Sequence, residues 1–110
     1  MRKGKETIMK IITSKTIYYI PVFSAQWRAF PQKEDAYFFS NDEENFAFEE
    51  SKATVRYYEE DFTLGEAIAD SVKRFKILKN SCSDYEFSDL RIERREANVV
   101  TKGEEVWRAE

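Results

Sequence analysis

The sequence predicts an α+β fold, a mostly antiparallel β-sheet with one main amphipathic helix, about residues 63–79, packed on a face. Short segments rich in Ile, Val, Tyr and Phe come before and after a single long segment whose apolar residues have helical spacing. Strands segregated from a helix in this way favour an antiparallel sheet over alternating βαβ units. With 110 residues, 42% of them hydrophobic, the chain can build one packed core.

Four segments before the helix are rich in β-branched and aromatic residues and are predicted to be strands. They are Met9–Ile12, Thr16–Phe23, Ala36–Ser40 and Ala53–Glu59. The first two are either separate strands with a turn at Ser14-Lys15 or one bent strand. The segment Trp27–Lys33 breaks the pattern and is predicted to be a loop, and Asn41-Asp42 is a turn-forming pair.

The helix is predicted to begin with a capping box at Thr63-Leu64-Gly65-Glu66. In this motif the Thr side chain accepts from the Glu amide, and the Glu side chain reaches back to the Thr amide. The following apolar residues repeat at helical spacing, and they are Leu64, Ile68, Val72 and Phe75. Lys79 and Asn80 predict its end, since a cation suits the last carbonyls and Asn tolerates a left-handed cap.

Three segments follow the helix. Tyr85–Arg95 is ambiguous between a strand and a short helix, because its apolar residues fit neither period cleanly. Ala97–Thr101 and Glu104–Arg108 are predicted to be strands, with Gly103 at the turn between them.

The expected organisation is a single domain over residues 9–110, preceded by a leader or disordered tail at residues 1–8. Met9 opens the first predicted strand, so we interpret it as the true start. The longest apolar run is far shorter than the roughly 20 residues that span a bilayer. Cys82 is the lone cysteine, so no intramolecular disulfide can form, and we expect a cytoplasmic protein.

The composition argues against catalysis and against a bound cofactor or metal. The chain contains no His, which removes the commonest general base and metal ligand. One Cys cannot make a thiolate zinc site, and the three glycines form no phosphate-binding loop. No activating base is evident for Cys82, so we expect an inert thiol rather than a nucleophile.

The negative charge is concentrated in the middle of the chain. Residues 34–61 hold ten acidic and two basic residues, a net charge of −8, whereas the whole chain carries −3. Such a surface repels nucleic acid and attracts cationic partners, although a solvated acidic loop is the simpler alternative. Aromatic residues interleave the acids and provide possible anchors. The predicted partner-binding residues are Asp42, Glu43, Glu44, Glu49, Glu50, Tyr58, Glu59 and Glu60.

The run Asp61-Phe62-Thr63-Leu64-Gly65-Glu66-Ala67-Ile68, continuing to Ser71, resembles a signature of immunity proteins from bacterial contact-dependent growth inhibition systems. The match covers about a fifth of the chain. The resemblance implies a cytoplasmic inhibitor of a toxin domain, often a nuclease with a basic cleft. It implies no catalytic residues, and it makes Leu64, Gly65, Ala67 and Ile68 fold-defining.

The sequence therefore predicts a protein that neutralises a cognate toxin domain in a one-to-one complex by covering its basic active site. It is expected to bind neither nucleic acid nor membrane. One alternative is another protein inhibitor or antitoxin, encoded by a phage or plasmid. The other is a small ligand-binding domain or enzyme with a carboxylate-lined pocket, for which a deep cleft with buried acids would be the sign.

Overall fold

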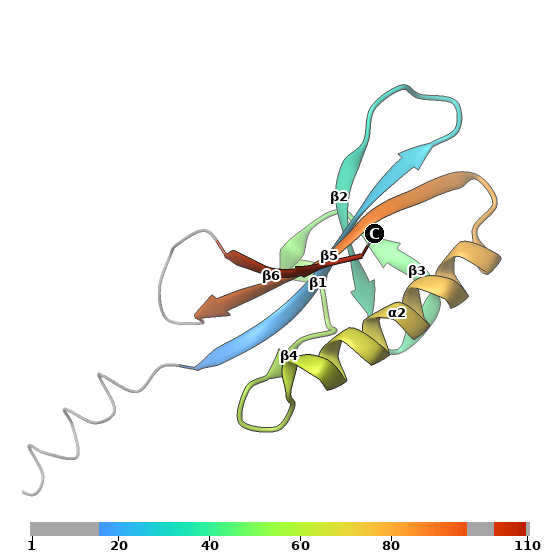
Figure 1. Cartoon of the computed structure of the whole chain (residues 1–110). Helices are drawn as coiled ribbons and strands as arrows, with labels where there is room; N and C mark the ends of the chain where they lie inside the picture. Colours follow the sequence, from blue (N-terminus) through green and yellow to red (C-terminus); the bar gives the residue numbers. More distant parts are fainter. Residues whose placement is uncertain (1–15, 97–102, 110) are drawn as a thin grey trace, which may run out of the picture.

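The computed structural model describes residues 16–96 and 103–109 and confirms the α+β fold (Figure 1). The predicted strands Met9–Ile12 and Ala97–Thr101 and the predicted leader lie outside these residues. The elements in chain order are β1 (Ile17–Trp27), β2 (Glu34–Phe39), β3 (Asp42–Ala47), the 3₁₀ turn η1 (Glu50–Lys52), β4 (Tyr57–Tyr58), α2 (Leu64–Ser81), β5 (Tyr85–Glu96) and β6 (Glu104–Arg108).

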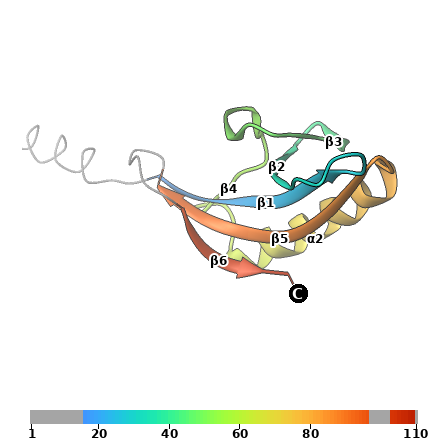
Figure 2. The ribbon, with the colours of Figure 1, turned by 90° about the horizontal axis from the view of Figure 1, so that it is seen from above.

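The six described strands form one antiparallel sheet in the order β3-β2-β1-β5-β6, with β4 also paired to β1. The second half of β1 pairs with β2 and its first half with β4, while β5 runs along its other edge (Figures 1 and 2). β1 is therefore the central strand of the sheet, since it pairs with β2, β4 and β5.

A β-bulge interrupts the long pairing of β1 with β5. Val22 and Ser24 are separated by one residue in β1, whereas their partners in β5 are separated by Asp89 and Leu90. Asp89 adopts a left-handed backbone conformation with φ 56°, which an extra residue in a strand commonly requires. The extra residue shifts the alternation of side chains, so that Phe87 and Leu90 both enter the same core.

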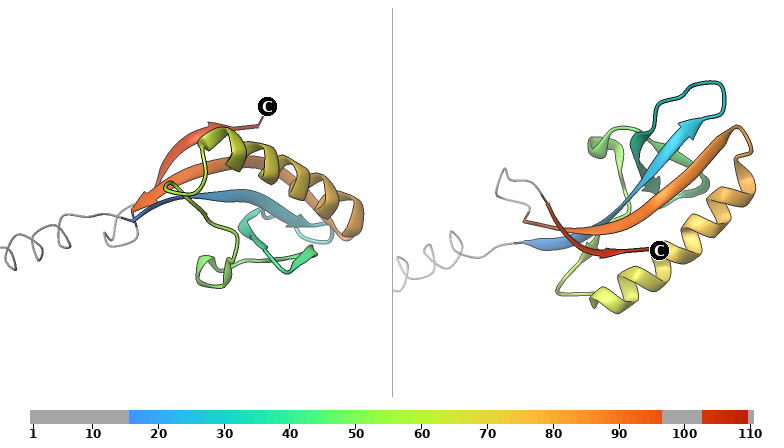
Figure 3. Two further views of the ribbon diagram at one scale, coloured as in Figure 1. Left: turned by 90° about the horizontal axis from the view of Figure 1, so that it is seen from below. Right: turned by 45° about the horizontal axis from the view of Figure 1, so that its top comes forward.

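Both faces of β1 are buried. Tyr19 and Phe23 belong to the larger core cluster, beneath α2, whereas Ile20 and Val22 belong to a second cluster. That second cluster is closed by Tyr37 of β2 and by Ala53, which follows η1. Figure 3 shows α2 on one side of the β1–β5 pair and η1 on the other. The predicted packing of the helix on a face of the sheet is confirmed.

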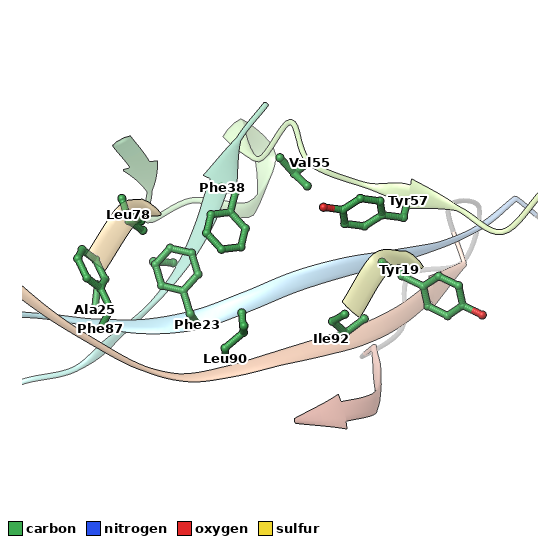
Figure 4. Close-up of a cluster of buried hydrophobic side chains, with 12 residues drawn as sticks. Tyr19, Phe23, Ala25, Phe38, Val55, Tyr57, Leu78, Phe87, Leu90 and Ile92 are labelled. Carbon is green, nitrogen blue, oxygen red and sulfur yellow. The ribbon is translucent and has the colours of Figure 1, made fainter. Parts of the chain in front are cut away.

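Phe23 lies at the centre of the larger cluster and is fully buried. Its ring centroid lies 4.7 Å from that of Phe38, 5.6 Å from that of Phe75 and 5.8 Å from that of Phe87. Figure 4 shows the buried side chains of this cluster in two groups, with Phe23 in one and with Tyr19, Tyr57 and Ile92 in the other. Rings from β2, α2 and β5 thus meet at Phe23 of β1, which fixes the position of α2 on the sheet.

The capping box at Thr63 and Glu66 is confirmed, with both reciprocal hydrogen bonds present. The predicted left-handed cap at Asn80 is wrong. The helix continues to Ser81 and is capped by Cys82, whose backbone is extended and whose amide donates to the carbonyl of Leu78. A local hydrogen bond at the extended cap therefore replaces the left-handed residue.

Two other predictions needed correction, and one ambiguity is resolved. Trp27 was placed in a loop, but it ends β1 because it pairs with Tyr85 of β5. Of the predicted strand Ala53–Glu59, only Tyr57–Tyr58 pairs, as β4. Tyr85–Arg95 is a strand within β5.

Candidate partner-binding surface

The predicted acidic residues lie in three separate places. Asp42, Glu43 and Glu44 are exposed on β3, Glu49 and Glu50 lie at η1, and Tyr58, Glu59 and Glu60 lie at β4 and the turn before α2. β3 is close to the end of α2, because the thiol of Cys82 donates to the carbonyl of Glu44 over 3.2 Å. α2 has 18 residues and is about 27 Å long. The structure does not bring the acids of β3 together with Glu59 and Glu60 (Figure 1).

Glu50 and Glu59 have partners inside the protein. Both carboxylate oxygens of Glu50 accept from Nη1 of Arg95, a guanidinium that also contacts Glu93. Glu59 Oε2 accepts from the Tyr19 hydroxyl over 3.1 Å. Burial and this carboxylate together raise the pKa of Tyr19. These two glutamates therefore connect parts of the fold, Glu50 to β5 and Glu59 to β1.

By contrast, the acids at the end of β3 have no cationic partner among residues 16–96 and 103–109. Asp42, Glu43 and Glu44 form no ion pair with any of these residues, and neither does Asp84 in the turn after α2. Burial raises the pKa of the Cys82 thiol, and the charges of Asp84, Glu44 and Asp42 raise it further. The contact between Cys82 and Glu44 brings the turn after α2 close to the acidic end of β3, and the negative charge there disfavours the thiolate that a nucleophile would need.

Exposed aromatic side chains gather beside these acids. Among the large hydrophobic residues described, Trp27, Phe30 and Phe48 are 41%, 58% and 42% exposed. The rings of Trp27 and Phe30 lie 4.6 Å apart, and Phe48 lies 6.2 Å from Tyr85. We call Trp27, Phe30, Phe48 and Tyr85 the aromatic end, which lies where β1 ends and β5 begins. Sequence reasoning placed the first two in a loop and overlooked them, although two aromatic residues in a predicted loop were a usable signal.

Two hollows flank the Phe48–Tyr85 pair and share both residues. The first, of about 300 Å³, is also lined by Ala25, Trp27, Phe30, Gln32 and Glu34. The second, of about 400 Å³, is also lined by Asn45, Phe46, Ser81, Cys82, Ser83 and Asp84. The aromatic end is therefore a grooved surface whose second hollow opens beside the unneutralised acids.

Comparison with protein-family models, curated proteins and solved structures finds no match to this chain. Within the described ranges, no group of three or more Cys, Asp or Glu residues is arranged to hold a metal ion. Across the same residues, no helix is long and apolar enough to cross a membrane.

The opposite end of α2 carries a mixed charge. A hollow of about 350 Å³ there is lined by Phe62 and by two acids and two arginines, among other residues. Asp70 accepts from the Tyr57 hydroxyl and, over 2.9 Å, from Nε of Arg74. Burial acts to raise the pKa of Asp70, but these hydrogen bonds outweigh it and hold the pKa below its usual value. This network ties β4 to α2 and leaves little net charge to attract a partner.

Proposed function

We propose that this protein is a toxin-neutralising immunity protein that binds a cationic toxin domain and covers its active site. The observation that carries the proposal is the hollow in which Asp84 lies beside the exposed ring of Phe48, next to the β3 strand that bears the unneutralised acids Asp42 and Glu44. A protein that masks a basic cleft needs this combination, because acids steer the encounter and a desolvated aromatic supplies contact energy. Inhibition by covering requires no chemistry of its own.

The proposal divides the predicted acids by position into those expected at the interface and those expected outside it. Asp42, Glu43, Glu44 and Glu49 can turn to a partner without breaking a strong internal contact. Glu50 is held by Arg95, and the remaining candidates lie beyond the other end of α2. We therefore expect the toxin to contact the β3 end of the molecule. As the resemblance of the helix start implies, the proposed site of action is the cytoplasm.

The direct test is co-purification from the native host, or from cells that also express the neighbouring large open reading frame, followed by a salt titration. A tight one-to-one complex with a basic domain that weakens as salt rises is expected. A chain that remains a stable monomer without a partner would refute the proposal and favour the ligand-binding alternative.

Two matched triple variants locate the interface. Asp42→Asn, Glu43→Gln and Glu44→Gln together remove three charges at the β3 end. Glu60→Gln, Asp61→Asn and Glu104→Gln remove the same three charges from exposed positions elsewhere.

The first triple variant is expected to weaken binding about tenfold and to flatten its salt dependence. Three exposed contacts of about 0.5 kcal/mol each approach the roughly 1.4 kcal/mol of a tenfold change. The second is expected to change binding less than about threefold, on the same reasoning for charges outside the interface. Equal losses would show that net charge matters and not this surface.

A further inference from the structure

We infer that the aromatic end is the docking site for one segment of the partner, and that this segment carries both an apolar side chain and an arginine or lysine. The apolar side chain would enter the hollow between Trp27, Phe30 and Phe48. The cationic side chain would enter the second hollow, against Phe48 and Tyr85. This inference rests on the proposed function in one respect, that the partner is a protein with a cationic surface.

The first argument is exposure. Trp27, Phe30 and Phe48 are three of the five large hydrophobic side chains that the described part of the chain leaves exposed, and they lie together. Large, rigid aromatic side chains at the rim of a hollow are the usual energetic centres of protein interfaces. The cluster is also continuous, because Phe48 contacts both Phe46 and Tyr85.

The second argument is the balance of charges around the groove. Two cations near it are already in ion pairs, since Arg28 pairs with Glu86 over 3.1 Å and Lys33 lies 3.6 Å from Asp89. Lys79 is placed over the ring of Phe75. The acids in the two linings, Glu34 and Asp84, have no ion-pair partner among the described residues. A partner's cation therefore finds free carboxylates here, whereas the linings of the two hollows present no Lys or Arg side chain to a partner's carboxylate.

The third argument is the end of α2. Ser81, the last residue of this 18-residue helix, lines the second hollow beside Cys82 and Asp84. The carboxyl end of a helix carries partial negative charge and favours a cation. A guanidinium or ammonium group in this hollow would meet that charge, the carboxylate of Asp84 and the face of a neighbouring aromatic ring, which is a further attraction for cations.

The other exposed aromatic pair does not satisfy the same conditions. Phe62 lines a hollow that also contains Arg56 and Arg74, and Arg56 lies over the ring of Tyr18. A partner's cation entering there would meet these two like charges as well as Glu66 and Asp70, so the hollow offers it little net attraction. Charge complementarity thus selects the aromatic end, although Phe62 and Phe48 are almost equally exposed, at 40% and 42%.

The test uses three capped five-residue peptides as probes, titrated into the isotopically labelled chain while amide shifts are followed by NMR. Their sequences are Arg-Leu-Arg-Leu-Arg, Gln-Leu-Gln-Leu-Gln and Arg-Ser-Arg-Ser-Arg. The first is expected to shift amides in residues 25–34, 45–49 and 81–86. The other two, which each lack one of the two required side chains, are expected to bind at least fivefold more weakly.

Two variants of matched exposure complete the experiment. Phe48→Ala is expected to weaken the first peptide at least fivefold, and Phe62→Ala is expected to leave its affinity within twofold of the parent. Phe30→Ala, at the most exposed of these rings, serves as a second probe of the groove if Phe48→Ala does not fold.

Shifts centred on Phe62, equal binding of the glutamine peptide, or unchanged affinity in both groove variants would overturn the inference. Peptide binding as expected without any cationic protein partner would refute the proposed function and leave the groove assignment standing. A toxin complex whose protected amides lie outside the aromatic end would refute the groove assignment alone.

Discussion

Replacing Glu50 by Gln is expected to destabilise the fold by about 1–2 kcal/mol, whereas Glu49→Gln is expected to cost less than about 0.5 kcal/mol. The two residues are neighbours, carry the same side chain and were predicted together as partner contacts. Both carboxylate oxygens of Glu50 accept hydrogen bonds from Arg95. The Glu50 side chain is 32% exposed and the Arg95 side chain is 18% exposed. Glu49 lies 3.9 Å from the ammonium of Lys52, and both side chains are 66% exposed.

The magnitude for Glu50 follows from its intermediate burial. An exposed ion pair contributes about 0–1 kcal/mol, and breaking a fully buried one costs about 3–5 kcal/mol. After Glu50→Gln, Arg95 still has Glu93, so its charge is not left alone, and the cost falls between the two limits. For a domain of this size the change corresponds to a fall in Tm of roughly 5–15 °C.

Urea unfolding followed by far-ultraviolet circular dichroism measures both variants against the parent chain. Equal midpoints for Glu49→Gln and Glu50→Gln would refute the separation of structural from partner-binding acids. For binding to a toxin partner, Glu49→Gln is expected to have the larger direct effect of the two substitutions. Glu49→Gln is expected to weaken binding without changing stability, and it therefore serves as the control for loss of fold.

Three further predictions concern stability. Thr63→Ala removes the acceptor for the Glu66 amide and is expected to cost about 1 kcal/mol in urea unfolding, which Thr63→Ser should largely restore. Asp89→Ala is expected to destabilise more than Asp89→Gly, by about 1 kcal/mol, because only glycine adopts φ 56° without steric cost; the reverse order would contradict the bulge. Hydrogen bonds from Tyr57 and Arg74 hold the pKa of Asp70 low against its burial, so its contribution is present above about pH 4 and is lost as pH falls further. Urea midpoints measured between neutral and acid pH should therefore fall less steeply for Asp70→Asn than for the parent.

Local signals in the sequence predicted the helix well, because capping and apolar spacing act between residues three or four apart. The bulge explains why β5 was ambiguous. Phe87 and Leu90 are three residues apart, a helical spacing, yet the extra residue at Asp89 turns both to one face of a strand. Trp27 was missed for a related reason, since its strand conformation depends on pairing with Tyr85, far along the chain.

The candidate site was predicted in composition but not in arrangement. The acids of residues 42–61 fall within one stretch of the sequence, but the length of α2 separates the first of them from the last in space. Asp84 lies outside the acidic stretch of the sequence, but it comes close to β3 because Cys82, at the end of α2, contacts the carbonyl of Glu44. A charge count along the sequence identifies an acidic protein, whereas only the fold shows which charges act together.

The central position of β1 has a consequence for synthesis. Its longest partner, β5, ends 69 residues after β1 does, which at about 5–20 residues per second means a delay of roughly 3–14 s on the ribosome. For that time the run from Tyr18 to Ala25, buried in the finished fold, emerges without the strand that covers its other edge. Such an edge pairs readily with other nascent chains. Slower translation between β1 and β5 should therefore lower the yield of native protein, while the stability of the molecules that do fold stays the same.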